Sequence, residues 1–269
     1  MKLGIMQHLL ERPDLESAFA AAAELGFEGI EIRYGPADTA LLTDPRHAER
    51  IVQLSQQFSL EVPSLCMGCI TRTSLIEPPE DVQKGIQMVR DGIALAADVG
   101  AKTVLLPFFG DSAIEVEAEL VSAISALEEI VPTAEERGVV LGVESMLNFN
   151  QQQFLLNHFA TSDNLKIYFD TGNALARKLD LPTGIRQLGA SAIAGIHYKD
   201  VHLAESMPPD FSVNIGKGNV DFRAVTQALR AIGYDGWVIL ETPPGNDPIA
   251  NARTNLAHVR STLAAAAMA

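Results

Sequence analysis

The sequence is poor in cysteine, and its two cysteines offer little chemistry. Cys66 and Cys69 are too few for a disulfide framework, and their CMGC motif has no second CxxC or histidine pair that would complete a zinc site. The motif closes a predicted strand, whereas a thioredoxin-like pair opens a helix. We therefore expect two ordinary thiols.

Basic residues and long hydrophobic runs are also scarce. The chain has 20 Lys and Arg against 34 Asp and Glu, a formal net charge of −14, which repels nucleic acid and anionic membrane surfaces. No apolar run approaches the roughly 18 residues of a membrane span, and residues 1–14 lack the h-region and cleavage site of a signal peptide. We expect a cytoplasmic protein that acts on a small molecule, with neither nucleic acid nor membrane as a partner.

Common nucleotide-binding and hydrolase motifs are missing. No GxGxxG follows a predicted strand, no GxxxxGK[ST] occurs, and no GxSxG is present. Gly216-Lys217-Gly218 is too short to be any of them. Dinucleotide binding, a P-loop and a hydrolase nucleophile elbow therefore have no basis in the sequence.

The chain alternates between strand-like and helix-like segments. Predicted strands cover residues 3–6, 28–33, 60–66, 102–110, 139–144, 165–169, 192–198 and 236–240. Predicted helices cover residues 14–26, 44–58, 79–100, 112–137, 151–158, 182–188, 221–232 and 249–266. Asp14 is a candidate N-cap, Pro45 suits a first helical turn, and Gly26 is a helix stop.

Eight strand-helix units with nearly continuous apolar strands indicate a parallel sheet covered by helices. With 269 residues and no visible linker, the chain fits a single α/β domain over residues 1–269, a closed (β/α)8 TIM barrel, better than an open doubly wound sheet. Residues 200–221 form the longest connection, where we expect a loop that covers a substrate.

Four predicted strands in the second half of the chain end at a polar residue: Glu144, Asp170, His197 and Glu241. The carboxyl ends of consecutive barrel strands lie side by side, so these side chains should converge at the mouth. Three neighbouring carboxylates would repel one another unless a cation lies between them. We therefore predict one divalent metal bound by all four residues. A lone acid at a strand end is more often a helix cap, so Asp170 could instead cap the turn into Asn173, and His197 could be a core histidine.

Three carboxylates with one imidazole favour Mn²⁺ or Mg²⁺ over a structural Zn²⁺, and four protein ligands leave two octahedral positions for substrate oxygens. A hydroxy-ketone that chelates the ion has an acidified α-proton, because the metal stabilises the enediolate. Glu144 and Glu241 are predicted to move the proton between two faces of the substrate and also to bind the metal. Asp170 and His197 are predicted as ligands only.

These motifs carry a family resemblance. The segments GVES at Glu144, FDTGNA at Asp170, IHYKD at His197, the NIGKGNVDF loop and ILET at Glu241 resemble the xylose-isomerase-like sugar-phosphate isomerase/epimerase family. The family includes D-tagatose 3-epimerase, hydroxypyruvate isomerase, myo-inosose dehydratase and L-xylulose-5-phosphate 3-epimerase. The resemblance implies one divalent metal on the matching Glu, Asp, His and Glu, Mn most readily, with Mg, Co or Zn as alternatives. It also implies proton transfer by the two glutamates, and a homodimer or homotetramer.

The chain departs from the D-tagatose 3-epimerase subgroup at Asn173, where the resemblance implies a substrate-binding histidine. Asn173, Lys199 and Lys217 are candidate contacts to substrate oxygens or a phosphate, although each lysine could equally be a solvated surface charge. His8 and Glu31 are expected at the first two strand ends, where each could bind sugar hydroxyls or, alternatively, pair with Arg33.

The leading hypothesis is a metal-dependent isomerase or epimerase of a ketose or ketose phosphate. A lyase of the myo-inosose dehydratase type on the same metal site is the alternative, distinguished by loss of water. An endonuclease IV-like phosphodiesterase would need three metals and more than the six histidines present. A barrel that binds a sugar without catalysis is a further possibility, disfavoured by the intact ligand residues.

Overall fold

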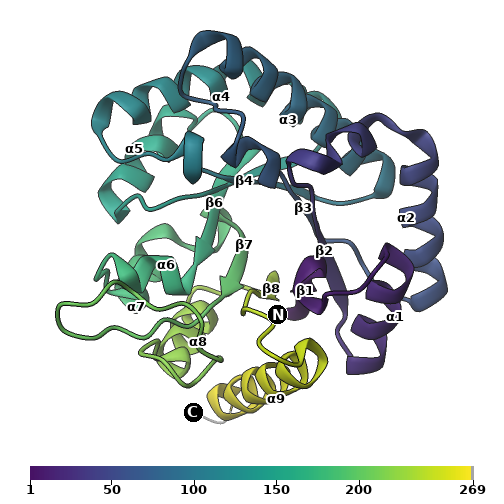
Figure 1. The fold of residues 1–269 in the computed structure, drawn as a ribbon. Coiled ribbons are helices and arrows are strands. Elements are labelled where there is room, and N and C mark those ends of the chain that lie inside the picture. The colour runs from purple at the N-terminus through teal and green to yellow at the C-terminus, as the bar shows by residue number, and fades with distance from the viewer. Residues whose placement is uncertain (268–269) are drawn as a thin grey trace. The chain divides into compact units, whose positions relative to one another are not determined.

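The computed structural model describes residues 1–267 and arranges eight parallel strands as a closed barrel in the order β1 to β8 (Figure 1). The strands are β1 (Lys2–Met6), β2 (Gly29–Arg33), β3 (Ser64–Cys66), β4 (Thr103–Pro107), β5 (Val140–Glu144), β6 (Leu165–Asp170), β7 (Ile193–Tyr198) and β8 (Trp237–Leu240). The α-helices are α1 (Leu15–Leu25), α2 (Pro45–Phe58), α3 (Pro79–Val99), α4 (Glu117–Arg137), α5 (Phe149–His158), α6 (Thr171–Ala176), α7 (Leu181–Leu188), α8 (Phe222–Ala231) and α9 (Pro248–Ala267). Short 3-10 helices follow β1 to β4: η1 (Gln7–Leu10), η2 (Pro36–Thr43), η3 (Gly68–Thr71) and η4 (Gly110–Ser112). Another, η5 (Ala190–Ala192), lies between α7 and β7. The predicted (β/α)8 barrel is confirmed.

Local sequence signals explain where the helices begin and end. Asp14 caps α1, because its carboxylate accepts the Ser17 N–H at 2.8 Å, and Gly26 ends the helix with a left-handed φ of 86°. Asp44 caps α2 through the Arg46 N–H at 3.0 Å, with Pro45 in the first turn. These boundaries agree with the sequence patterns.

Several elements differ from their predictions, among them β4, which ends at residue 107 rather than 110. β3 begins at Ser64 rather than residue 60, since Pro63 lacks an N–H for the ladder. α4 begins at Glu117 rather than residue 112, because the Glu119 carboxylate accepts the Val116 N–H at 2.9 Å and fixes the start there. α6 was not predicted, since six residues are too few for a periodic pattern.

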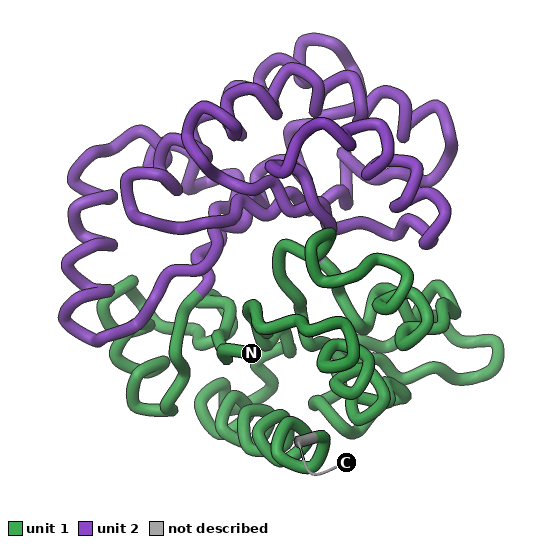
Figure 2. The backbone as a smooth tube through the Cα atoms, turned by 180° about the vertical axis from the view of Figure 1, so that it is seen from behind, with its two compact units in different colours: residues 1–30, 169–269 green, residues 31–168 purple. Residues whose placement is uncertain are grey.

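The chain divides into two compact units, coloured separately in Figure 2. The second unit, residues 31–168, pairs β2 with β3, β3 with β4, β4 with β5 and β5 with β6. Inside it, the fully buried Glu31 carboxylate accepts hydrogen bonds from Ser64 Oγ and, at 2.7 Å, from Tyr168 OH. Because β2, β3 and β6 contribute these three side chains, they belong to the layered barrel interior.

The first unit, residues 1–30 and 169–269, joins both ends of the chain by pairing β1 with β8 from Lys2↔Trp237 to Ile5↔Leu240. β7 pairs with β8 through His197↔Ile239 and Tyr198↔Leu240. The arrangement brings the last residues of β7 and β8 to the same level. The expectation of one domain over residues 1–269 stays a prediction.

None of the helices within residues 1–267 is long and apolar enough to cross a membrane.

Candidate metal centre

Asp170 is the last residue of β6 and the N-cap of α6. Its Oδ1 accepts the Asn173 N–H at 2.6 Å, which is the capping bond considered from the sequence. The other oxygen, Oδ2, lies 3.9 Å from His197 Nδ1. Capping therefore occupies one oxygen of this buried carboxylate and directs the second toward the imidazole.

His197 and Glu241 come from neighbouring strand ends. His197 lies on β7 with a side chain that is 1% exposed, and Glu241 directly follows β8, where its N–H donates to Tyr198 O at 3.1 Å. His197 Nδ1 is 3.1 Å from Glu241 Oε2. One ligand atom from each of Asp170, His197 and Glu241 lies within 4.8 Å of the others. The predicted convergence of these three residues is confirmed.

Lys199 neutralises part of this acidic group. Its Nζ lies 3.1 Å from Glu241 Oε2 and 3.9 Å from Asp170 Oδ2. Burial raises the pKa of the Glu241 carboxyl, but the Lys199 ammonium and His197 together lower it by more than burial raises it. The pKa therefore lies well below the usual value for a glutamate. Glu241 is therefore ionised at neutral pH. Contact between Lys199 and a substrate stays a prediction.

The spacing of these atoms suits a metal ion. Ligands of an octahedral ion with bonds near 2.1 Å are about 3.0 Å apart when adjacent and about 4.2 Å apart when opposite. The distances of 3.1 Å and 3.9 Å from His197 Nδ1 fall in this range. The donor set of imidazole and carboxylates is also one that divalent cations accept.

Glu144 is the last residue of β5 and is 4% exposed. It pairs with Pro107 of β4, and its carbonyl accepts the Phe108 N–H at 2.8 Å. With Asp170, His197 and Glu241 it makes up a group of three carboxylates and one imidazole, a candidate site for a divalent metal.

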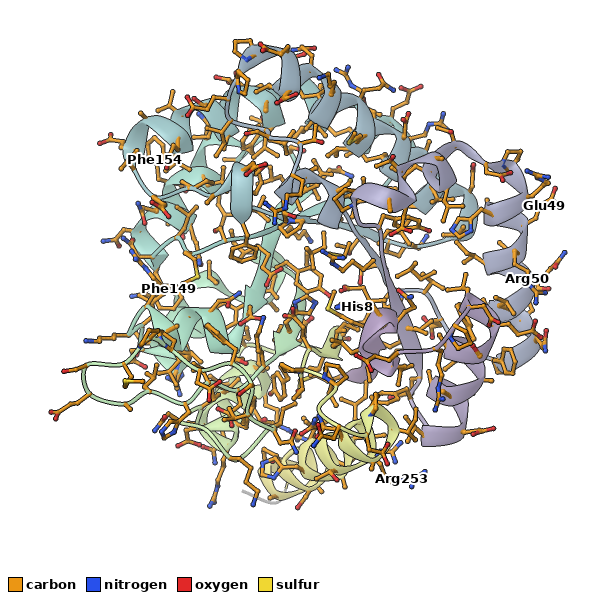
Figure 3. The ribbon with its side chains drawn as sticks, in the orientation of Figure 1. His8, Glu49, Arg50, Phe149, Phe154 and Arg253 are labelled. Carbon is orange, nitrogen blue, oxygen red and sulfur yellow. The ribbon has the colours of Figure 1, made fainter. Side chains whose placement is uncertain are left out.

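The other predicted contact residues occupy varied positions. Asn173 is buried on α6, whereas Lys217 is exposed in the loop before α8. His8 is exposed on η1 (Figure 3). Glu31 was expected at the end of β2 but is its middle residue, with a carboxylate engaged inside the barrel, so that placement is wrong. Substrate contact by any of these residues stays a prediction.

Sequence reasoning missed two residues that support the site. Thr171 Oγ1 donates to Lys199 O at 2.7 Å and accepts the Lys199 N–H at 3.0 Å, which ties the end of β6 to the end of β7. Asp200 is 1% exposed and accepts four backbone N–H groups of the chain that follows it. Thr171 lies in the FDTGN segment and Asp200 in the HYKD segment, so the family motifs in the sequence could have pointed to both residues.

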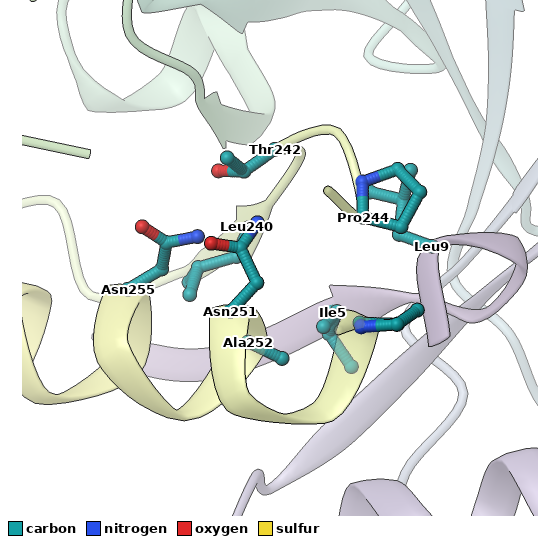
Figure 4. Close-up of a pocket in the computed structure, with 9 residues that line it drawn as sticks. Ile5, Leu9, Leu240, Thr242, Pro244, Asn251, Ala252 and Asn255 are labelled. Carbon is teal, nitrogen blue, oxygen red and sulfur yellow. The ribbon is translucent and has the colours of Figure 1, made fainter. Parts of the chain in front are cut away.

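A small pocket lies beside the carboxyl end of β8, against α9 (Figure 4). Its volume of about 10 Å³ suits one water molecule and is far too small for a sugar. Thr242, Asn251 and Asn255 supply its polar lining. The pocket is therefore a packing feature behind the strand end and no substrate site.

Comparison with known proteins agrees with the barrel fold described above. Residues 19–262 match the family described as xylose isomerase-like TIM barrel. The chain belongs to this family. The resemblance seen in its sequence motifs is thereby confirmed.

Individual relatives are distant. L-ribulose 3-epimerase from Mesorhizobium japonicum is 26% identical over 233 residues, which cover 82% of this chain and 73% of that protein. The 2-epi-5-epi-valiolone 7-phosphate 2-epimerase from an Actinoplanes species is 27% identical over 224 residues, which cover 81% of this chain and 78% of that protein. A solved structure of L-ribulose 3-epimerase has a TM-score of 0.82 at 22% identity, covering 99% of this chain and 96% of that one, and so supports the fold. The family thus includes sugar epimerases.

Proposed function

We propose that the chain is a divalent-metal-dependent isomerase or epimerase of a ketose or ketose phosphate. Its metal ligands are Glu144, Asp170, His197 and Glu241, and its acid/base pair is Glu144 and Glu241. The observation that carries the proposal is the buried group of Asp170, His197 and Glu241, with ligand atoms 3.1 Å and 3.9 Å apart. Relatives named as epimerases support the reaction class.

Strand register supports Glu144 as the fourth ligand. β5 pairs with β6 through Val143↔Ile167, so Glu144, the last residue of β5, lies level with the part of β6 that continues to Asp170. Both strands end at a carboxylate on the side of the barrel where TIM-barrel enzymes bind substrate. We expect Mn²⁺, with Mg²⁺, Co²⁺ or Zn²⁺ as alternatives.

A bound ion would polarise the carbonyl of a hydroxy-ketone and lower the pKa of the neighbouring C–H. One glutamate then accepts the α-proton, and the other returns a proton from the opposite face, which inverts the carbon. Return to the adjacent carbon gives isomerisation. Glu241 enters this exchange as a carboxylate, because Lys199 and His197 keep its pKa low.

Lys199 has two roles in the proposal. Its ammonium, with a side chain 17% exposed, holds the Glu241 carboxylate at 3.1 Å. The same group can donate to a substrate oxygen when charge develops there, as a fixed donor at a strand end. One relative is named for a free sugar and the other for a phosphorylated compound, so both types belong in the substrate screen.

Metal content is the first test. We expect about one divalent ion per chain in purified wild type, and loss of that ion in Asp170→Ser and Glu241→Gln. Serine at position 170 keeps an N-cap for α6, so metal loss in Asp170→Ser separates ligation from capping. Glu136→Gln, which changes an exposed acid of α4, is the matched control and should retain the ion.

Turnover is measured next, as deuterium incorporation at the α-carbon of ketoses and ketose phosphates in D₂O. Exchange should vanish with a chelator and in Glu144→Gln. Absence of bound metal after reconstitution would overturn the proposal. Release of water with the metal site intact would assign the lyase chemistry instead.

A further inference from the structure

Arg33 lies at the mouth end of the barrel wall. It is the last residue of β2, two positions after Glu31, and is half-buried. Side chains two residues apart on a strand share a face. Since Glu31 points into the barrel interior toward Ser64 and Tyr168, Arg33 leaves the strand on the interior face at its carboxyl end.

Two glycines make room for the guanidinium of Arg33. A Cβ at Gly68 would lie 2.7 Å from Arg33 Cζ, and one at Gly35 would lie 3.3 Å from Nη1. Gly35 has a φ of −84°, which any residue can adopt, so the backbone does not require glycine there. The two positions instead leave space that the guanidinium occupies.

This guanidinium has no partner in the described chain. Within residues 1–267, Arg33 makes no hydrogen bond through its side chain and has no carboxylate oxygen within 4.0 Å. The nearby Asp38 carboxylate accepts the Gly35 N–H through Oδ2 at 2.9 Å and does not approach the guanidinium within 4.0 Å. Forked guanidinium donors match the oxygens of a carboxylate or phosphate, so these unpaired donors are available to an anionic ligand.

The glycine-containing loop before α8 offers no competing backbone site for an anion. Gly216, Gly218 and Val220 donate their N–H groups to the Asp200 carboxylate at 2.8–3.0 Å. The N–H groups of residues 217 and 219 donate to carbonyl oxygens of residues 214 and 201. Every backbone N–H from 216 to 220 therefore has an acceptor, and this loop offers no free backbone donor to a substrate anion.

We infer that Arg33 binds an anionic group of the substrate, a phosphate or a carboxylate, through its forked N–H donors. The inference rests on the proposed function, since it treats the carboxyl ends of the strands as the substrate side. It extends that function by selecting phosphorylated or acidic sugars over neutral ones.

The test titrates metal-free protein with inorganic phosphate and, separately, with acetate, while NMR follows the Nε–H signal of Arg33. Wild type should give a saturable shift with at least one anion, and the anion that binds more tightly identifies the group. In Arg33→Gln, anion affinity measured by calorimetry should fall about tenfold or more, which corresponds to a charge-assisted hydrogen bond. Arg33→Lys should be intermediate, because it keeps the charge without the fork.

Two further variants make the result specific. Gly68→Ala keeps the arginine but would bring a Cβ within 2.7 Å of its Cζ, so the guanidinium must move and anion binding should also weaken. Lys102→Gln, which removes an exposed cation at the amino end of β4, should bind within about twofold of wild type. Equal anion affinity in wild type and Arg33→Gln, or an equal loss in Lys102→Gln, would overturn the inference. Since the titration needs neither metal nor turnover, its failure is distinct from failure of the proposed function.

Discussion

A single buried carboxylate, that of Asp200, organises the loop that follows β7. It accepts the N–H groups of Val201, Gly216, Gly218 and Val220 at 2.8–3.0 Å. A Cβ at residue 218 would collide with Asp200 Oδ1, so this close approach requires glycine. Asp200 comes directly after Lys199, so the same carboxylate fixes the chain beside the proposed metal centre.

Replacing Asp200 should loosen this loop more than it unfolds the barrel. Asp200→Asn keeps one acceptor oxygen but turns an NH₂ group toward two donors, and should lower the free energy of unfolding by about 1–3 kcal/mol. Asp200→Ala leaves all four N–H groups without this acceptor and should cost about 3–5 kcal/mol. Chemical denaturation measures both changes.

Hydrogen exchange gives the local readout for Asp200→Asn, because protection at residues 216, 218 and 220 should fall while that of the strands is kept. Asp210→Asn is the control, since Asp210 is exposed in the same connection and bonds only the nearby Ser212 among the contacts of its carboxylate. Unchanged protection in Asp200→Asn would show that the loop is held by other contacts.

At the scale of elements, the sequence predicted the barrel because its signals are local. Asp14, Asp44 and Asp221 mark helix starts by accepting N–H groups of residues no more than three positions away. Apolar strands that alternate with these helices then favour a parallel sheet covered by helices. The short helices that follow strands have too few residues for a periodic apolar pattern. The start of α6 depends on Asp170, which the sequence allowed to be either a metal ligand or a helix cap.

The candidate site was predictable only in part. Strand ends reveal Asp170, His197 and Glu241, because a buried run that stops at a polar residue is visible in the sequence. The roles of Arg33 and Asp200 were not visible, since they depend on glycines and N–H groups of separate segments, up to 35 residues away for Gly68. Long-range contacts of this kind follow from the closed fold rather than from spacing.

The contact between β8 and α9 leads to a prediction about bound water. Thr242 is 7% exposed, and its Oγ1 finds no hydrogen-bond partner within residues 1–267. The adjoining pocket holds about one water, with the side chains of Asn251 and Asn255 in its lining (Figure 4). A high-resolution crystal structure should show a water bonded to Thr242 Oγ1.

Loss of this water should have a measurable cost. Thr242→Val should lower the free energy of unfolding by about 0.5–1.5 kcal/mol. Thr254→Val, on the exposed side of α9, should change it by less, since Thr254 bonds only its own helix at Ala250 O. A Thr242→Val protein more stable than wild type would show that the pocket is dry and the hydroxyl simply unsatisfied.

For the whole molecule, the proposed metal links residues far apart in the sequence. Its ligands lie at the carboxyl ends of β5, β6, β7 and β8 and span residues 144 to 241, so binding should favour the folded chain over the unfolded one. At a metal concentration 100 times the Kd, the linkage contributes about 2.7 kcal/mol. For a chain of this size that corresponds to a rise in Tm of about 5–10 °C.

Thermal unfolding with MnCl₂ and with EDTA checks this linkage, and Asp170→Ser is the decisive comparison. The variant keeps the cap of α6 but lacks the carboxylate, so its Tm should not respond to the metal. The net charge of −14 could attract divalent ions to the surface without any specific site. An equal rise in Tm in wild type and Asp170→Ser would therefore assign the effect to surface charge, whereas a rise confined to wild type and Glu136→Gln would locate the ion at the strand ends.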